Sequence, residues 1–197
     1  MDYKFKTEPY EHQLKALGAS HNKENFALFM EMGTGKSKVL IDNIAMLFDK
    51  GKINSAIIVA PKGVYRNWER QEIPTHMPEH VDYSILVWNP SSTSFMKEYA
   101  KFLKDEDKLK IFLINIDAFS TSRGTDIAKR FMISTQCLMA IDESTTIKTP
   151  TAKRTKTVCK MRTFAKYRRI LTGSPVTKSP LDLYTQCYFL DPDLLDF

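Results

Sequence analysis

The chain has 197 residues, of which 43% are hydrophobic and 26% charged, so it can bury one good core and little more than one domain. Its three cysteines are far apart and form no CxxC pair, which argues against a disulfide framework or zinc site and favours a reducing compartment. The net charge is +6, no signal peptide begins the chain and no apolar run spans a membrane, so we expect no membrane partner and a cytoplasmic location, in a bacterium or a virus-infected host cell.

Short apolar runs alternate with helical patterns along the chain. Buried strands are expected at 26–30, 55–60, 84–87, 109–116, 137–141 and 169–171. Helices are expected at 36–48, 64–73, 94–103, 151–164 and 181–190. Pro74 and Pro78 are expected to break the chain after the second of these helices. This alternation predicts an α/β domain with a doubly wound, mostly parallel sheet flanked by helices, and no linker divides it.

The stretch LFMEMGTGKSKVLI runs from the first expected strand into the first expected helix, which is the context that a phosphate-binding loop requires. Gly33 and Gly35 can adopt positive φ, so that backbone N–H groups point at phosphate oxygens. Lys36 is expected to reach the β- and γ-phosphates and the Ser37 hydroxyl to coordinate Mg²⁺. The helix dipole adds to this attraction. Met30 stands where the strict pattern has its first glycine, so the match is incomplete.

Two acids, Asp142 and Glu143, directly follow the expected strand CLMAI. The carboxyl ends of parallel strands line the ligand crevice, so both acids are expected near the glycine loop. Asp142 can hold Mg²⁺ through water, and Glu143 can orient and deprotonate an attacking water. The alternative is that the pair caps the next helix. The sequence LTGSP follows the last expected strand, and its Thr172 and Ser174 can hydrogen-bond to the acids, unless it is a simple turn.

Together these motifs resemble the N-terminal RecA-like motor domain of superfamily 2 helicases and translocases, most closely the Swi2/Snf2-like DNA-dependent ATPases. The resemblance covers nearly the whole chain through six ordered segments: EPYEHQLKAL, MEMGTGKS, IIVAPKGVYRNWERQEI, IFLINIDAF, AIDESTTIKTP and ILTGSPVTKSPLDLYTQCYFLDP. In this family the first position of the phosphate loop is normally not glycine. The resemblance implies one RecA-like P-loop NTPase domain over 1–197, with ATP and Mg²⁺ as cofactors.

Site residues follow from the resemblance position by position. Catalysis is assigned to Lys36, Asp142 and Glu143, and Mg²⁺ to Ser37 and Asp142. Coupling between the acid pair and LTGSP is assigned to Thr172 and Ser174. Gln13 is expected to read adenine with Tyr10 packing nearby, and the phosphate loop contributes the remaining ATP contacts: Met32, Gly33, Thr34, Gly35, Lys36 and Ser37.

The chain departs from the family pattern in three places. The acid motif ends Ser-Thr, so its usual coupling to LTGSP is expected to pass through Thr145 or to be weaker. Ser174 replaces a frequent threonine and keeps the hydroxyl. The second RecA-like domain, whose arginines complete the ATP site, is absent and is expected in a missing C-terminal part or in trans. Without those arginines turnover falls by about 10³–10⁵-fold, so the isolated domain is expected to hydrolyse ATP slowly.

A polyanion partner is indicated by charge distribution, because 144–181 contains ten lysines and arginines and no acid. The stretch 148–169 is interpreted as a charge patch and not as a defined site. Trp68 and Trp88 are interpreted as core residues and not as platforms for stacking bases. The resemblance implies contacts with the nucleic-acid backbone, duplex DNA favoured over single strands and RNA, at Lys62, Arg66, Ser120 and Arg123.

The leading interpretation is therefore the ATP-binding half of a DNA-dependent motor. A second interpretation is a nucleotide-gated nucleic-acid-binding module with little turnover of its own. A third, a P-loop kinase of a small substrate, lacks a substrate-binding lid and leaves the acid pair, LTGSP and the basic stretch without a role.

Overall fold

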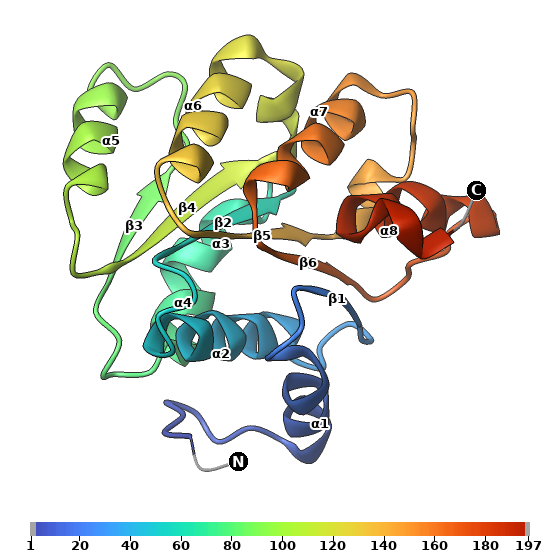
Figure 1. Ribbon diagram of the computed structural model, residues 1–197, viewed down its shortest axis with the longest axis horizontal. Helices are drawn as coiled ribbons and strands as arrows, with labels where there is room; N and C mark the ends of the chain where they lie inside the picture. The colour runs from blue at the N-terminus through green and yellow to red at the C-terminus, as the bar shows by residue number, and fades with distance from the viewer. Residues whose placement is uncertain (1–2, 196–197) are drawn as a thin grey trace.

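The computed structural model describes residues 3–195, which form a six-stranded sheet with helices on both faces (Figure 1). The strand order is β1-β6-β5-β2-β4-β3, and every pair of neighbours is parallel. The predicted doubly wound sheet is confirmed, and it is wholly parallel. The strands are β1 (Asn25–Phe29), β2 (Ser55–Ala60), β3 (Tyr83–Val87), β4 (Leu109–Asn115), β5 (Cys137–Asp142) and β6 (Tyr167–Thr172).

The helices divide between the two faces of the sheet. In Figure 1, α1 to α4 lie below it and α5 to α8 lie above it. The lower group is α1 (Glu11–Ser20), α2 (Lys36–Asp49), α3 (Tyr65–Asn67) and α4 (Ile73–His76). The upper group is α5 (Phe95–Leu103), α6 (Ser122–Ile133), α7 (Lys153–Met161) and α8 (Tyr184–Leu190). Short 3₁₀ turns occupy Ile116–Ser120, Ser144–Ile147, Arg162–Phe164, Pro180–Leu183 and Pro192–Leu195.

The core has two apolar layers, one on each face of the sheet. Every residue of β2 and β4 is buried, as expected for central parallel strands that are covered on both sides. Trp68 lies in the lower layer and is 1% exposed, and Trp88 lies in the upper layer and is 2% exposed. The interpretation of both tryptophans as core residues is confirmed. Within the described residues no helix is long and apolar enough to cross a membrane.

The helices differ from expectation at three places. Helices α1 and α6 were not predicted; α6 has a glycine in its first turn and relies on the Thr121 hydroxyl, which accepts a hydrogen bond from Gly124 N. Pro74 does not end the helix: it directly follows the π-helical turn, whose wider spacing accommodates a residue that lacks an N–H, and the helix continues to His76. Between α3 and α4 the helix continues as a π-helical turn, Trp68–Glu72.

Candidate nucleotide site

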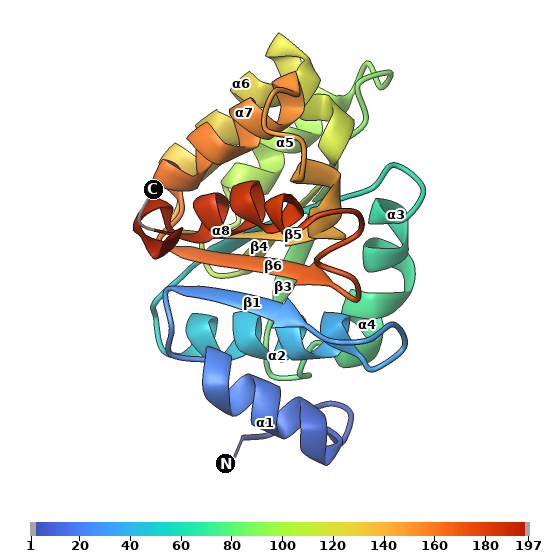
Figure 2. The same ribbon diagram turned by 90° about the vertical axis from the view of Figure 1, so that its right-hand side faces the viewer.

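Three loops meet at one edge of the sheet because of the strand order. β6 lies between β1 and β5, so the glycine loop after β1, LTGSP at the end of β6 and the acid pair at the end of β5 lie side by side. Figure 2 shows β1 and β6 running in the same direction into these loops. The carboxyl edge of a parallel sheet is where α/β proteins bind ligands, so the strand order alone assembles the predicted motifs.

The glycine loop has the backbone that phosphate binding requires. Gly33 and Gly35 have φ of 78° and 84°, in the left-handed region that favours glycine. Helix α2 begins at Lys36, so the N–H groups of its first turn, including that of Ser37, have no acceptor within the helix. The Lys36 ammonium donates to the carbonyls of Met30 (3.0 Å) and Glu31 (3.1 Å). These donors and this cation fit the anionic phosphates of a nucleotide.

Gln13, expected to read adenine, joins α1 to the glycine loop. Its side chain is 5% exposed; Oε1 accepts a hydrogen bond from Tyr10 N (3.0 Å) and Nε2 donates to the Thr34 carbonyl (3.0 Å). Tyr10 is exposed and stacks on His12, whose Nε2 hydrogen-bonds with the same Thr34 carbonyl at 2.9 Å. His12 was not singled out from the sequence, because its contact with the loop arises only when α1 docks. Met32 also is exposed at the loop.

The Asp142 carboxylate is held by two hydrogen bonds. Its Oδ2 accepts from the indole Nε1 of Trp68 (3.0 Å), and its Oδ1 accepts from the backbone N–H of Glu143 (3.0 Å). Burial raises the pKa of Asp142, the Trp68 hydrogen bond opposes this rise, and the Lys36 charge also opposes it.

Glu143 has an unusual backbone conformation, and its side chain contacts Thr172. Its φ of 50° is the only positive value for a non-glycine among residues 3–195, and such a conformation costs free energy that the surrounding contacts must offset. Its Oε2 accepts a long hydrogen bond from the Thr172 hydroxyl (3.4 Å), which in turn accepts from Ser174 N (3.2 Å). Thr172 therefore touches the acid through its hydroxyl, whereas Ser174 takes part through its backbone.

Gly173 brings LTGSP against the glycine loop. A Cβ at this position would lie 3.2 Å from Met32 N and 3.5 Å from the Met30 carbonyl. Sequence reasoning did not single out Gly173 for this contact, because the approach depends on β1 and β6 being neighbours.

Substitution of Gly173 by alanine is therefore expected to weaken nucleotide binding about tenfold, which corresponds to about 1.4 kcal/mol of overpacking against the loop. Titration with a fluorescent ATP analogue measures the effect. Gly63→Ala is the matched control, because a Cβ at Gly63 would meet no atom within 4 Å. Equal ATP affinities for the two variants would show that the contact at position 173 does not affect nucleotide binding by the glycine loop.

Besides the hydrogen bond from Thr172 to Glu143, the acid motif is linked to LTGSP through the side chain of Ser144. The Ser144 hydroxyl donates to Gln186 Oε1 (2.6 Å), and Gln186 Nε2 donates to the carbonyls of Pro175 (2.9 Å) and Asp182 (2.7 Å). Gln186 lies on α8 and is fully buried. Within residues 3–195 the side chain of Ser144, and not that of Thr145, makes this hydrogen bond, so the link expected at Thr145 lies one position earlier.

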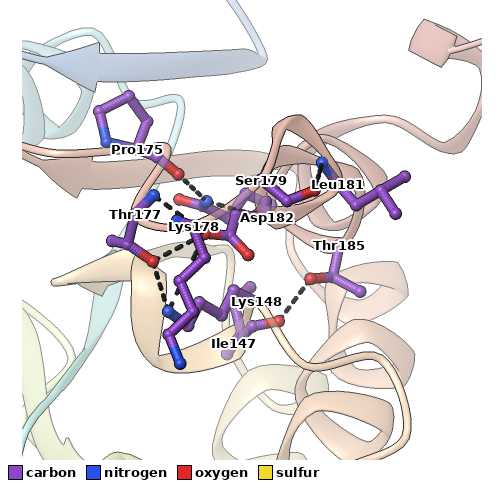
Figure 3. Close-up of polar contacts among 10 residues, drawn as sticks. Ile147, Lys148, Pro175, Thr177, Lys178, Ser179, Leu181, Asp182 and Thr185 are labelled. Atoms are coloured by element: carbon purple, nitrogen blue, oxygen red, sulfur yellow. Dashed lines mark hydrogen bonds and ion pairs between the residues drawn. The ribbon is translucent and has the colours of Figure 1, made fainter.

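The loop after LTGSP is fastened by the carboxylate of Asp182 (Figure 3). Asp182 Oδ2 accepts from Thr177 N (2.9 Å), Thr177 Oγ1 (2.7 Å) and Lys178 N (2.8 Å). These hydrogen bonds hold the pKa of Asp182 well below its usual range. Lys148, from the segment after the acid motif, hydrogen-bonds to Thr177 Oγ1 and lies 3.9 Å from Asp182. The acid motif and LTGSP are thus tied together at a second point.

The expected nucleic-acid contacts gather around a groove of about 370 Å³ formed by the loops after β2, β3 and β4. Lys62, Tyr65 and Trp88 line it. Exposed Arg66 donates through Nε to the Tyr65 hydroxyl (3.4 Å). The guanidinium of exposed Arg123 lies 5.9 Å from the centre of the Trp88 ring. Three of the four predicted residues therefore share one rim.

The fourth, Ser120, ends the 3₁₀ turn Ile116–Ser120 and directly precedes Thr121, which lines the same groove. Arg123 is also fixed by a hydrogen bond from its Nη1 to the Pro90 carbonyl (2.9 Å). The four positions, which come from two distant segments of sequence, are brought together at this groove.

The basic stretch 148–169 is not one charged surface. Arg169 is 0% exposed, Arg154 forms an ion pair with Asp117 (3.0 Å), and Lys148 contacts Asp182. A pocket of about 430 Å³ between α7 and α8 is lined by others of the group, Lys156, Lys160 and Arg162, and by no residue of the glycine loop. The interpretation as a single charge patch is therefore corrected, because sequence does not tell which of these cations are buried.

Comparisons with known proteins agree with this geometry. The sequence profile of the SNF2-related domain family matches residues 11–196. A SWI2/SNF2 ATPase core domain from Sulfolobus solfataricus is 25% identical with a TM-score of 0.73, over 100% of this chain and 38% of that one. The same core in complex with dsDNA is 24% identical with a TM-score of 0.77, over 99% of this chain and 38% of that one.

Curated relatives are long proteins. Chromatin remodeling factor mit1 of Schizosaccharomyces pombe is 23% identical over 163 residues, which are 82% of this chain and 11% of that protein. Chromodomain-helicase-DNA-binding protein 8 of Danio rerio is 26% identical over 181 residues, 87% of this chain and 7% of that protein. The chain thus spans only a small part of the relatives it matches.

Proposed function

The chain belongs to the SNF2-related domain family, and from that premise we propose that it is the ATP-binding N-terminal half of a motor that moves on DNA. Membership places it among ATP-hydrolysing motor domains. The observation that carries the proposal is the meeting of three motifs at one sheet edge. Thr172 hydrogen-bonds to Glu143 there, and Gly173 packs against Met32 of the glycine loop.

Each residue of the proposed site has a role that its position supports. Lys36, Ser37 and Asp142 would hold ATP and Mg²⁺. When bound, ATP would supply the phosphoryl group and Mg²⁺ would neutralise its charge. Glu143 would accept the proton of the attacking water. Gln13 would orient the loop from α1, and Tyr10, exposed beside it, would pack on the base.

A second RecA-like domain, on the same polypeptide or in trans, would complete the site. Arginines supplied from across the cleft stabilise the transition state of phosphoryl transfer, and without them turnover falls by about 10³–10⁵-fold. We therefore expect this chain alone to bind ATP and to hydrolyse it slowly.

Duplex DNA is the proposed track, and the groove rimmed by Lys62, Arg66 and Arg123 is the proposed contact on this chain. Such cations contact phosphates and not base edges, so binding should weaken as salt rises and should show no sequence preference. The Sulfolobus solfataricus core in complex with dsDNA supports the choice of duplex.

The proposal is tested by measuring ATP turnover with duplex DNA, single-stranded DNA and RNA, after adding a second RecA-like domain. Stimulation by duplex DNA is the expected result. A rate near zero under every condition would favour the alternative, a nucleotide-gated DNA-binding module with little turnover. Transfer of phosphate to a small metabolite would overturn both.

Lys36→Ala is expected to weaken ATP binding at least about 100-fold, since a charge-assisted contact of about 3 kcal/mol is lost. Isothermal titration with Mg²⁺-ATP measures this. Lys52→Ala removes an exposed lysine beyond the other end of α2 and should bind like the wild type. Wild-type affinity in Lys36→Ala would place the phosphates elsewhere.

The expected cytoplasmic location, in a bacterium or infected cell, is wrong. The relatives are chromatin-remodelling proteins of eukaryotes, such as mit1 of Schizosaccharomyces pombe and CHD3-type chromatin-remodeling factor CHR7 of Arabidopsis thaliana, which point to the nucleus. The error has a simple cause: nuclear and cytoplasmic proteins both lack signal peptides and both keep cysteines reduced, so these features do not separate the two compartments.

A further inference from the structure

Trp68 makes a polar contact that its burial in the core does not require. It is 1% exposed, and its indole Nε1 donates to Asp142 Oδ2 at 3.0 Å. A buried indole has a single N–H donor, and any acceptor would satisfy it. In this protein that donor meets the carboxylate assigned to Mg²⁺, across 74 positions of sequence.

This hydrogen bond completes the orientation of the carboxylate. Asp142 Oδ1 accepts from Glu143 N at 3.0 Å, so each oxygen has one fixed donor. A carboxylate oxygen can accept more than one hydrogen bond, so both oxygens keep a lone pair for a metal-bound water. Two donors on the two oxygens fix the plane of the group, and loss of either leaves the side chain free to rotate.

The backbone around Trp68 connects this contact to the groove. Trp68 opens the π-helical turn Trp68–Glu72, and its carbonyl accepts from Ile73 N, the five-residue spacing of a π-helix. The same helical segment starts at Tyr65, which lines the groove and whose hydroxyl accepts a hydrogen bond from Arg66. Trp68 is thus three residues, less than one helical turn, from Tyr65 in the groove wall.

We propose that Trp68 is a positioning residue that orients Asp142 for the Mg²⁺ of bound ATP and ties the metal site to the helical segment that begins at the groove. This inference rests on the proposed function of Asp142. Outer-shell hydrogen bonds of this kind typically change metal affinity by about 10–100-fold when removed.

The experiment compares Trp68→Phe with Tyr99→Phe. Tyr99 is also buried, at 5% exposed, but it lies in the other apolar layer, where its hydroxyl donates to the Ile127 carbonyl (3.5 Å). The probe is a fluorescent ATP analogue, titrated into the 197-residue chain with and without Mg²⁺. Trp68→Phe should raise the Mg²⁺ concentration needed for half-maximal binding about tenfold, while metal-free binding stays unchanged. Tyr99→Phe, which also removes one buried donor, should change neither.

Replacing Trp68 with benzothienylalanine provides a second test that preserves packing. This residue has the shape of tryptophan with sulfur in place of the N–H, and it is introduced in a Trp88→Phe background. The Mg²⁺ requirement should rise as in Trp68→Phe, with an unchanged melting temperature. An unchanged Mg²⁺ requirement, or an equal loss of metal-free binding, would show that Trp68 only packs the core. A wild-type chain that binds ATP without regard to Mg²⁺ would overturn the proposed function and this inference together.

Discussion

Glu143→Gln is expected to lower ATP turnover by about 10²–10⁴-fold while leaving ATP affinity within about twofold of the wild type. The amide of glutamine cannot accept the proton of the attacking water. It still offers an oxygen to the Thr172 hydroxyl, and glutamine bears the positive φ of 50° no worse than glutamate does. The loss therefore falls on the chemical step. Turnover is measured with duplex DNA and the second RecA-like domain present, and affinity with a fluorescent ATP analogue.

Glu106→Gln is the control for this experiment, because Glu106 lies in an exposed turn between α5 and β4. It should behave like the wild type in both measurements. Full turnover by Glu143→Gln would remove Glu143 as the general base. A large loss of ATP affinity would make it a binding residue instead.

Arg169→Met is expected to lower the free energy of unfolding by about 3 kcal/mol or more, because several buried acceptors lose their donor at about 1–3 kcal/mol each. Arg169 is 0% exposed, and no carboxylate of residues 3–195 forms an ion pair with it. Burial lowers its pKa to about 10, so the guanidinium stays charged at neutral pH. It donates to Asn43 Oδ1 and to the carbonyls of Ser20, Lys23, Glu24 and Arg168.

Urea unfolding measures this difference, with Arg130→Met as the matched control on the exposed face of α6. Methionine preserves much of the apolar stem, so the comparison isolates the guanidinium and its hydrogen bonds. If the two variants unfolded at the same urea concentration, Arg169 would not be the structural residue that its contacts indicate.

The strands were predictable because buried parallel strands have continuous apolar sequences. β2 reads SAIIVA and β4 reads LKIFLIN, continuous apolar runs that suit parallel strands covered on both faces. The missed helices carry weaker signals. α6 is polar on average, with Gly124 in its first turn, and its apolar face becomes clear only against the sheet. The π-helical turn at Trp68 has no local signature at all.

Site residues were predictable as motifs, but their mutual contacts were not. The hydrogen bond between Trp68 and Asp142 and the approach of Gly173 to Met32 depend on which strands are neighbours. Local sequence does not give that order. The basic stretch shows the same limit. In the sequence Arg169 is one of several closely spaced cations, but in the structure it is buried in the core.

The position of β1 in the sheet bears on how the protein is made. β1 lies at the edge and pairs only with β6, so that Asn25 faces Arg168. A ribosome releases the glycine loop well before β6, the strand that pairs with β1, because the four other strands lie between them in sequence. Arg169, which caps the segment from α1 to β1, arrives at the same late moment. The neighbouring strands of the nucleotide site therefore come together only after β6 has left the ribosome, and a nascent chain that ends before Tyr167 has the ATP motif without the strand that pairs with β1.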